Sequence, residues 1–180
     1  MYSSSCPITL ELFRCPVIAA DGHTYEYESI RRWLNQRHPH SPLTSAILPS
    51  KVLVHNHALR GAFIELTRRA RHSTSGHGRF NCFVRAKPDP LVPPRAFICP
   101  ITHALMSDPV ATADGQSYEH GAIQQWLTNS NRSPLTGSLL SSKTLIRNHT
   151  LRSAVNEWLR AHALSPVEPQ PEKELVAAAA

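Results

Sequence analysis

The stretch Cys6-Pro7-Ile8-Thr9 decides the fold, because it returns as Cys99-Pro100-Ile101-Thr102, with every residue number raised by 93. An internal repeat fixes the unit of folding before any single residue is interpreted. The same offset aligns a Pro-Val pair, an Asp-Gly pair, a Tyr-Glu pair and an Ile-x-x-Trp-Leu motif, and 15 of the 29 residues in 6–34 are identical. The chain of 180 residues therefore contains two copies of one unit.

The second half of the unit repeats as well. A Ser-Pro-Leu-Thr motif at residues 41–44 returns at 133–136, and 15 of the 30 residues in 41–70 are identical. A unit of this size is a small domain, which buries only about 60% of the surface of its unfolded chain. We expect one domain at 1–70 and another at 96–162. Residues 71–95, rich in Ser, Gly and Pro, are expected to form a linker, and residues 163–180 a disordered tail.

Each unit has the pattern of a hairpin followed by two helices. A Pro-Val strand, an Asp-Gly turn and a returning strand predict a β-hairpin over residues 109–118. Apolar residues at helical spacing predict a helix over 26–34 and over 119–127. Asn56 and Asn148 precede a second apolar periodicity and are predicted helix N-caps. This combination gives an α+β fold class.

Composition excludes several classes of protein. Apolar residues make up 41% and charged residues 18%, as in globular proteins. No apolar run approaches the roughly 18 residues that cross a bilayer, so we expect no membrane partner. The four cysteines lack a C-x-x-C pair and a regular spacing, which favours a reducing compartment. The basic excess is largest in 71–95, which is typical of a solvated linker, and stacking aromatics are sparse there, so nucleic acid binding is disfavoured.

Zinc is also disfavoured by the ligand count. A structural zinc site needs four Cys or His ligands, and only Cys6/Cys99 and His57/His149 occupy equivalent positions in the two units. We therefore predict no metal and no other cofactor. Polar side chains would then hold the loops, unless they serve only as turn and cap residues. The repeated candidates are Asp21/Asp114, Glu26/Glu119, Ser41/Ser133, Thr44/Thr136, Lys51/Lys143 and Asn56/Asn148.

These motifs, in this order over about three-quarters of the chain, resemble the U-box, the zinc-free relative of the RING domain. The resemblance implies two small RING-like domains, each with a β-hairpin, a central helix, long loops and a C-terminal helix. It further implies an E3 ubiquitin transferase, which holds a ubiquitin-conjugating enzyme and its ubiquitin in a reactive arrangement. Such a ligase supplies orientation and forms no covalent intermediate on itself.

The resemblance also implies which residues contact the conjugating enzyme: Ile8, Leu10, Trp33 and Pro42 in the first unit, and Ile101, His103, Trp126 and Pro134 in the second. For the Ile and Trp residues, burial in the core is the alternative. Arg132 fits the position of an arginine that bridges ubiquitin and the conjugating enzyme, whereas His40 stands there in the first unit. The second unit is therefore expected to be the more competent ligase.

Several alternatives stay open at this point. The chain could be an inactive U-box scaffold, or one box could recruit the conjugating enzyme while the other binds an unknown protein substrate. Since U-boxes often dimerise, the two boxes could pair within one chain or between two chains. We expect a cytoplasmic or nuclear protein, or one acting in a host cytosol if it is a secreted effector.

Overall fold

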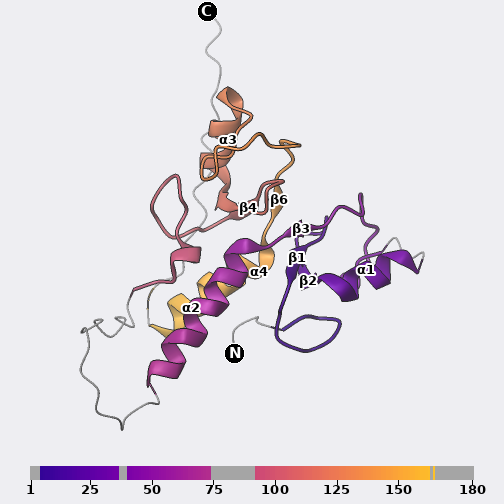
Figure 1. Cartoon of the computed structure of the whole chain (residues 1–180), viewed down its shortest axis with the longest axis horizontal. Coiled ribbons are helices and arrows are strands. Elements are labelled where there is room, and N and C mark those ends of the chain that lie inside the picture. Colours follow the sequence, from indigo (N-terminus) through magenta and orange to yellow (C-terminus); the bar gives the residue numbers. More distant parts are fainter. Residues whose placement is uncertain (1–4, 37–39, 74–91, 163, 165–180) are drawn as a thin grey trace, which may run out of the picture.

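The computed structural model describes residues 5–36, 40–73, 92–162 and 164 (Figure 1). Most of the expected linker (74–91) and most of the expected tail (165–180) lie outside the described residues. Among the described residues, no helix is both long and apolar enough to cross a membrane.

The first unit is a three-stranded antiparallel sheet with two helices. Strands β1 (Pro16–Ile18) and β2 (Thr24–Glu26) form the predicted hairpin, and β3 (Val54–His55) pairs with the other edge of β1. Helix α1 (Tyr27–Asn35) follows β2 directly, and helix α2 (His57–Ser73) follows β3. The sheet order is β2-β1-β3.

The second unit repeats this topology after a short 3-10 helix, η1 (Arg95–Phe97). Its strands are β4 (Pro109–Ala111), β5 (Ser117–Glu119) and β6 (Ile146–Arg147), in the order β5-β4-β6. Its helices are α3 (His120–Asn129) and α4 (His149–Ala161). The two matching α+β units confirm the predicted fold class. The strands β3 and β6 were not predicted, because two residues are too short to show the alternation of a strand.

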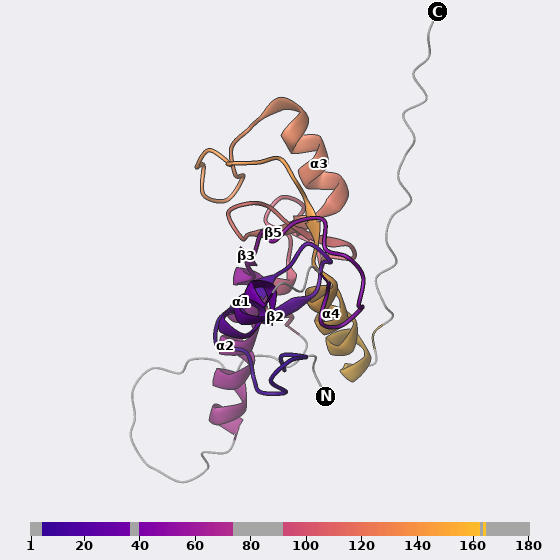
Figure 2. The same ribbon diagram turned by 90° about the vertical axis from the view of Figure 1, so that its right-hand side faces the viewer.

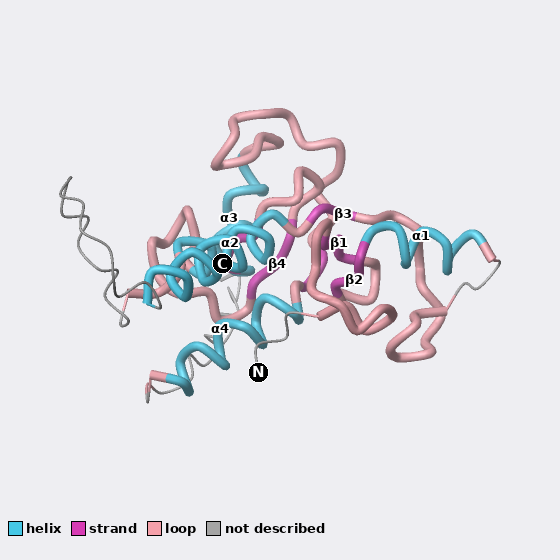
Figure 3. The backbone as a smooth tube through the Cα atoms, turned by 60° about the horizontal axis from the view of Figure 1, so that its bottom comes forward, coloured by secondary structure: helices cyan, strands magenta, loops and turns pink. Residues whose placement is uncertain are grey.

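The two units lie against each other through their C-terminal helices and hairpin turns. Helices α2 and α4 lie side by side, whereas α1 and α3 lie at the far ends of their units (Figures 1 and 2). Strand β1 contacts α2 and strand β4 contacts α4, and in the view of Figure 3 both strands lie between these helices and α1. The first helices of the two units, α1 and α3, therefore lie away from the contact between α2 and α4.

The buried apolar residues form two main clusters, one for each unit. The first includes Val17, Tyr25 and Ile30. The second includes Phe97, Tyr118, Ile123 and Trp158, but also Leu59 and Ala62 from α2. Helix α2 belongs to the first unit by sequence, yet its buried face completes the core of the second.

Candidate functional site

The first loop of each unit is held by its own backbone and by a buried thiol. The amide of Cys6 donates to the carbonyl of Glu11, and the amide of Leu10 donates to the carbonyl of Cys6, both at 2.8 Å. The Cys6 sulfur accepts a hydrogen bond from the amide of Glu26 at 3.2 Å. Leu10 adopts φ 59° and its side chain is 80% exposed. The loop therefore presents an apolar side chain to solvent in a fixed conformation.

The second loop is held by a serine and a tyrosine. The Ser41 hydroxyl oxygen accepts from the amides of Leu43 and Thr44 at 3.2 and 3.1 Å, and lies 3.1 Å from the hydroxyl of Tyr25. Burial raises the pKa of the Tyr25 phenol well above its usual range. The hydroxyl therefore stays protonated and donates to Asp21 at 2.9 Å.

The second unit builds the same loop with Ser133 and Tyr118, whose hydroxyl oxygens lie 3.0 Å apart. Its loop turns at Gly137, with φ 69°, where the first unit has Ser45, with φ 59°. The second loops of the two units therefore contain equivalent Tyr–Ser contacts, although they turn at different residue types.

An indole connects the helix to the second loop in each unit. Trp33 donates from Nε1 to the carbonyl of His40 at 2.9 Å, and Trp126 donates to the carbonyl of Arg132 at 2.8 Å. A lysine ammonium binds the end of the same helix, since Lys143 Nζ lies 2.7 Å from the carbonyl of Leu127. Lys51 makes the equivalent bond in the first unit, at 3.1 Å to the carbonyl of Leu34. Helix and loop are therefore positioned together.

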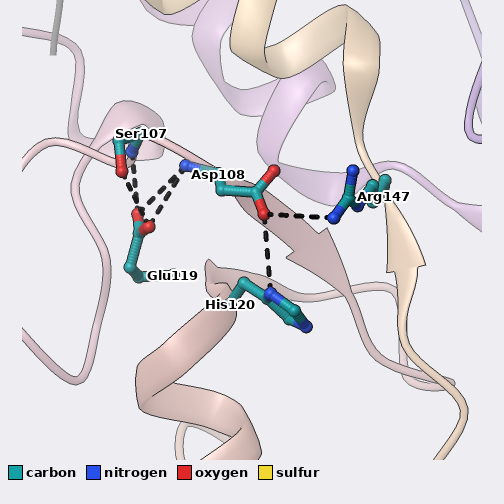
Figure 4. A network of polar contacts seen from close by, with 5 residues as sticks. All are labelled: Ser107, Asp108, Glu119, His120 and Arg147. Carbon is teal, nitrogen blue, oxygen red and sulfur yellow. Dashed lines mark hydrogen bonds and ion pairs between the residues drawn. The ribbon is translucent and has the colours of Figure 1, made fainter. Parts of the chain in front are cut away.

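A glutamate joins the hairpin to the end of the first loop. The Glu119 carboxylate accepts from the amide and the hydroxyl of Ser107 at 2.7 and 2.8 Å, and from the amide of Asp108 at 3.1 Å (Figure 4). Glu26 accepts from the amides of Arg14 and Cys15 at 2.9 and 3.0 Å. These bonds confirm that repeated polar side chains hold the loops.

Next to this glutamate the two units differ. Asp108 lies 3.5 Å from His120 Nδ1 and 4.0 Å from an Nη atom of Arg147, which gives the second unit a charged cluster (Figure 4). The equivalent positions in the first unit are Cys15, Tyr27 and His55. There the Cys15 sulfur lies 3.9 Å from His55 Nδ1, and the Tyr27 and His55 rings lie 6.3 Å apart.

The predicted site residues lie on the first loop, the first helix and the second loop of each unit. Leu10, His103 and Trp126 are exposed, whereas Ile8, Trp33, Pro42, Ile101 and Pro134 are half-buried. Ile8 and Trp33 pack against the core of the first unit, and Ile101 against that of the second. These side chains thus line the core and also reach solvent, and their contact with a partner stays a prediction.

Sequence reasoning missed further apolar side chains on the same loops. The sequence could have indicated them, because they are apolar residues in otherwise polar loops and lack the helical or strand periodicity that would place them in a core. They are more than half exposed: Leu12 at 71%, Leu43 at 52%, Ile47 at 73%, Leu135 at 55% and Leu139 at 72%. Each unit therefore shows an apolar surface, larger than the predicted residues alone would give.

Arg132 lies on the second loop of the second unit with its side chain exposed. Its guanidinium donates from Nη1 to the carbonyl of Gly137 at 2.9 Å, and its amide donates to the hydroxyl of Ser130 at 3.1 Å. The guanidinium thus lies along its own loop, with further donors left for a partner. In the first unit, His40 is exposed at the equivalent position.

Away from these surfaces, the two units contact each other with near twofold symmetry. The side chains of Asn56 and Asn148 exchange two amide hydrogen bonds, each 3.1 Å long. The amide of His57 donates to the carbonyl of Gly115 at 3.3 Å, and the amide of His149 donates to the carbonyl of Gly22 at 3.1 Å. Equivalent residues of the two units thus bind each other across the contact.

The titratable side chains bear on whether a metal ion could bind in the part of the chain that the structure describes. No group of three or more His, Cys, Asp or Glu residues is arranged to hold a metal ion within 5–36, 40–73 and 92–162. Cys6 and Cys99 are 1% and 0% exposed, so their thiols are packed inside the two cores.

Comparison with known proteins gives one consistent family. Residues 4–67 and 92–164 both match the U-box domain. U-box domain-containing protein 70 of Oryza sativa subsp. japonica is 48% identical over 82 residues, which are 45% of this chain and 10% of that protein. WD repeat, SAM and U-box domain-containing protein 1 of Homo sapiens is 49% identical over 70 residues, 38% of this chain and 15% of that protein.

A longer match is found with another relative. Putative U-box domain-containing protein 55 of Arabidopsis thaliana is 35% identical over 115 residues, 63% of this chain and 20% of that protein. The chain thus spans a fifth or less of the length of these three relatives.

Proposed function

Because the chain belongs to the U-box family, we propose that it is an E3 ubiquitin ligase that recruits a ubiquitin-conjugating enzyme. U-box domains are typical of such ligases. One observation carries the proposal: each unit holds an exposed apolar surface on two loops and a helix, rigidly braced by polar bonds. Exposed apolar patches of this kind mark sites of protein–protein contact.

We propose that the loop of a conjugating enzyme binds across this surface. In the first box the contacts are Ile8, Leu10, Trp33 and Pro42, and in the second box Ile101, His103, Trp126 and Pro134. The half-buried side chains of Ile8, Trp33 and Ile101 have one face fixed by a core, so little side-chain entropy is lost when the other face is covered.

The ligase then acts by orientation. The conjugating enzyme already carries ubiquitin as a thioester, and the substrate lysine attacks it while the box holds both proteins in place. The buried thiols of Cys6 and Cys99 support a mechanism without a covalent intermediate on these two residues. Arg132 would leave the carbonyl of Gly137 and bridge ubiquitin and the conjugating enzyme with its planar donors. We therefore propose the second box as the more competent of the two.

We further propose that the division at 1–70 and 96–162 gives the two functional boxes, and that they pair within one chain. The hydrogen bonds between Asn56 and Asn148 support this pairing. The cytoplasm or nucleus is the proposed location. The comparisons give no support to the hypothesis of a secreted effector. A division of labour, in which one box binds the substrate, is an outcome that the following experiment can reveal.

The test is autoubiquitination with activating enzyme, ubiquitin and a panel of conjugating enzymes. We expect conjugates with the wild type and a loss of more than tenfold with Ile101→Ala, while Ile8→Ala alone has a smaller effect. Ile64→Ala, on the exposed face of α2, serves as a matched control for loss of an aliphatic side chain. Circular dichroism verifies that each variant is folded.

Each result has a definite meaning. Loss with Ile8→Ala alone would reverse the ranking of the boxes and leave the ligase proposal standing. An absence of conjugates from a folded wild-type chain with every conjugating enzyme tested would favour the inactive scaffold.

A further inference from the structure

The contact between the boxes contains two histidines in equivalent places, each against a glycine of the other box. The ring of His57 packs on Gly115, where a Cβ atom would lie 2.7 Å from its Cδ2. The ring of His149 packs on Gly22, where a Cβ atom would lie 2.6 Å from its Cδ2. These approaches leave no space for a methyl group, so the two rings fill the contact closely.

More basic than acidic groups surround the two rings. The His149 ring lies 5.2 Å from the ring of His23 in the other box, and the His57 ring lies 5.8 Å from that of His55. The charged groups that act on His57 or His149 are Arg60, Asp108, Asp114, Arg147 and Arg152. Asp21, beside Gly22, is engaged by the hydroxyl of Tyr25 and the amide of His23.

The paired state disfavours the protonated form of both histidines. Burial, and then the neighbouring His55, lower the pKa of His57 below its usual 6.5, against the opposing charge of Asp114. Burial, and then His23 and two arginines, lower the pKa of His149 in the same way, against Asp108. A proton on either ring would therefore add a positive charge among buried or basic neighbours.

We propose that the box–box contact is acid-sensitive: protonation of His57 and His149 weakens the contact and favours separation of the two boxes. Neither histidine belongs to a core cluster, but Leu59 and Ala62 of α2 lie in the cluster of the second box, so separation would also open part of that core. Separation would leave the candidate surfaces on the first helices intact but would end their fixed relative orientation. The inference concerns the pairing and stands independently of ligase activity.

The direction of the effect follows from linkage. Burial of both rings in the contact, and for His149 also the His23 ring of the other box, lower the pKa values in the paired state, so the paired state binds fewer protons. The histidine contribution to the pairing free energy is therefore largest above the pKa of the separated rings and falls as the pH drops below it. With two histidines, the pairing constant falls by at most about 100-fold for each pH unit in that range.

The experiment measures the full chain by small-angle X-ray scattering between about pH 8 and about pH 5, the range in which histidine titrates. We expect the largest dimension to increase on acidification at constant mass. The double variant His57→Gln with His149→Gln cannot gain these protons and should keep its dimensions. His40→Gln, which removes an exposed histidine of the second loop, should respond as the wild type does.

Two outcomes would overturn the proposal: a wild-type chain with constant dimensions across this range, or a double variant that responds as the wild type does. If the double variant fails to pair at neutral pH, an NMR titration of the wild-type imidazoles decides. We expect His57 and His149 to titrate below pH 6.5, and titration of both at or above 6.5 would refute the acid switch.

Discussion

At the scale of single residues, Glu119 joins the hairpin of the second unit to its first loop. Its carboxylate accepts hydrogen bonds from the amide and hydroxyl of Ser107 and from the amide of Asp108. Hydrogen bonds to a charged group contribute about 1.5–3 kcal/mol each. Glu119→Gln keeps the shape but loses the charge, so we expect a destabilisation of about 1–3 kcal/mol in urea unfolding. Glu28→Gln, on the exposed face of α1, should change the stability far less.

The two roles of Asn148 show what could be predicted from the sequence and what could not. Asn148 was predicted as an N-cap, and its side chain accepts from the amide of Leu151 at 3.1 Å, which confirms the prediction. A cap is a local feature, so the neighbouring residues are enough to recognise it. The amide group of Asn148 also binds Asn56 in the other box. That contact depends on the arrangement of the two boxes, which the sequence around either asparagine does not contain.

At the scale of elements, a substitution in the β4–β5 turn tests how closely the boxes pack. Gly115→Ala places a Cβ atom at φ 80° and 2.6 Å from the carbonyl oxygen of His55. Gly137→Ala is a matched control, because it has φ 69° and nothing within 4 Å of the new atom. The control should cost about 1–2 kcal/mol from backbone strain alone. We expect Gly115→Ala to cost more in chemical unfolding and to increase the dimensions of the chain at neutral pH. Equal costs for the two variants would contradict the close contact.

Some helices and strands are determined by neighbouring residues, whereas others depend on contacts between distant parts of the sequence. The hairpin and the first helix were predicted in both units, because turn residues and apolar spacing are visible within a few residues. Helix α1 begins at Tyr27, one residue later than expected, because Glu26 ends strand β2. Strands β3 and β6 exist only because each pairs with a strand that lies far away in the sequence. Their two-residue length leaves no pattern to recognise.

At the scale of the whole molecule, the two boxes share their topology but differ in how their cores are packed. Leu59 and Ala62 of α2 lie in the core cluster of the second box, together with Phe97 of η1. The amide of Arg95 in η1 donates to the Glu65 carboxylate of α2 at 3.0 Å. The main cluster of the first box contains no residue of α4. The second box therefore depends on the first more than the first depends on the second.

This asymmetry predicts that a change in the first box destabilises the second. Leu59 is 0% exposed, and replacing a buried leucine by alanine costs about 2–5 kcal/mol. For Leu59→Ala we expect faster hydrogen exchange at the amides of Tyr118 and Ile123, measured in the full chain. Leu53→Ala is the control, because Leu53 packs against the core of the first box, so its effect should stay within that box. If Leu59→Ala accelerated exchange only in the first box, the shared core would be excluded, and each box would be stabilised by its own residues alone.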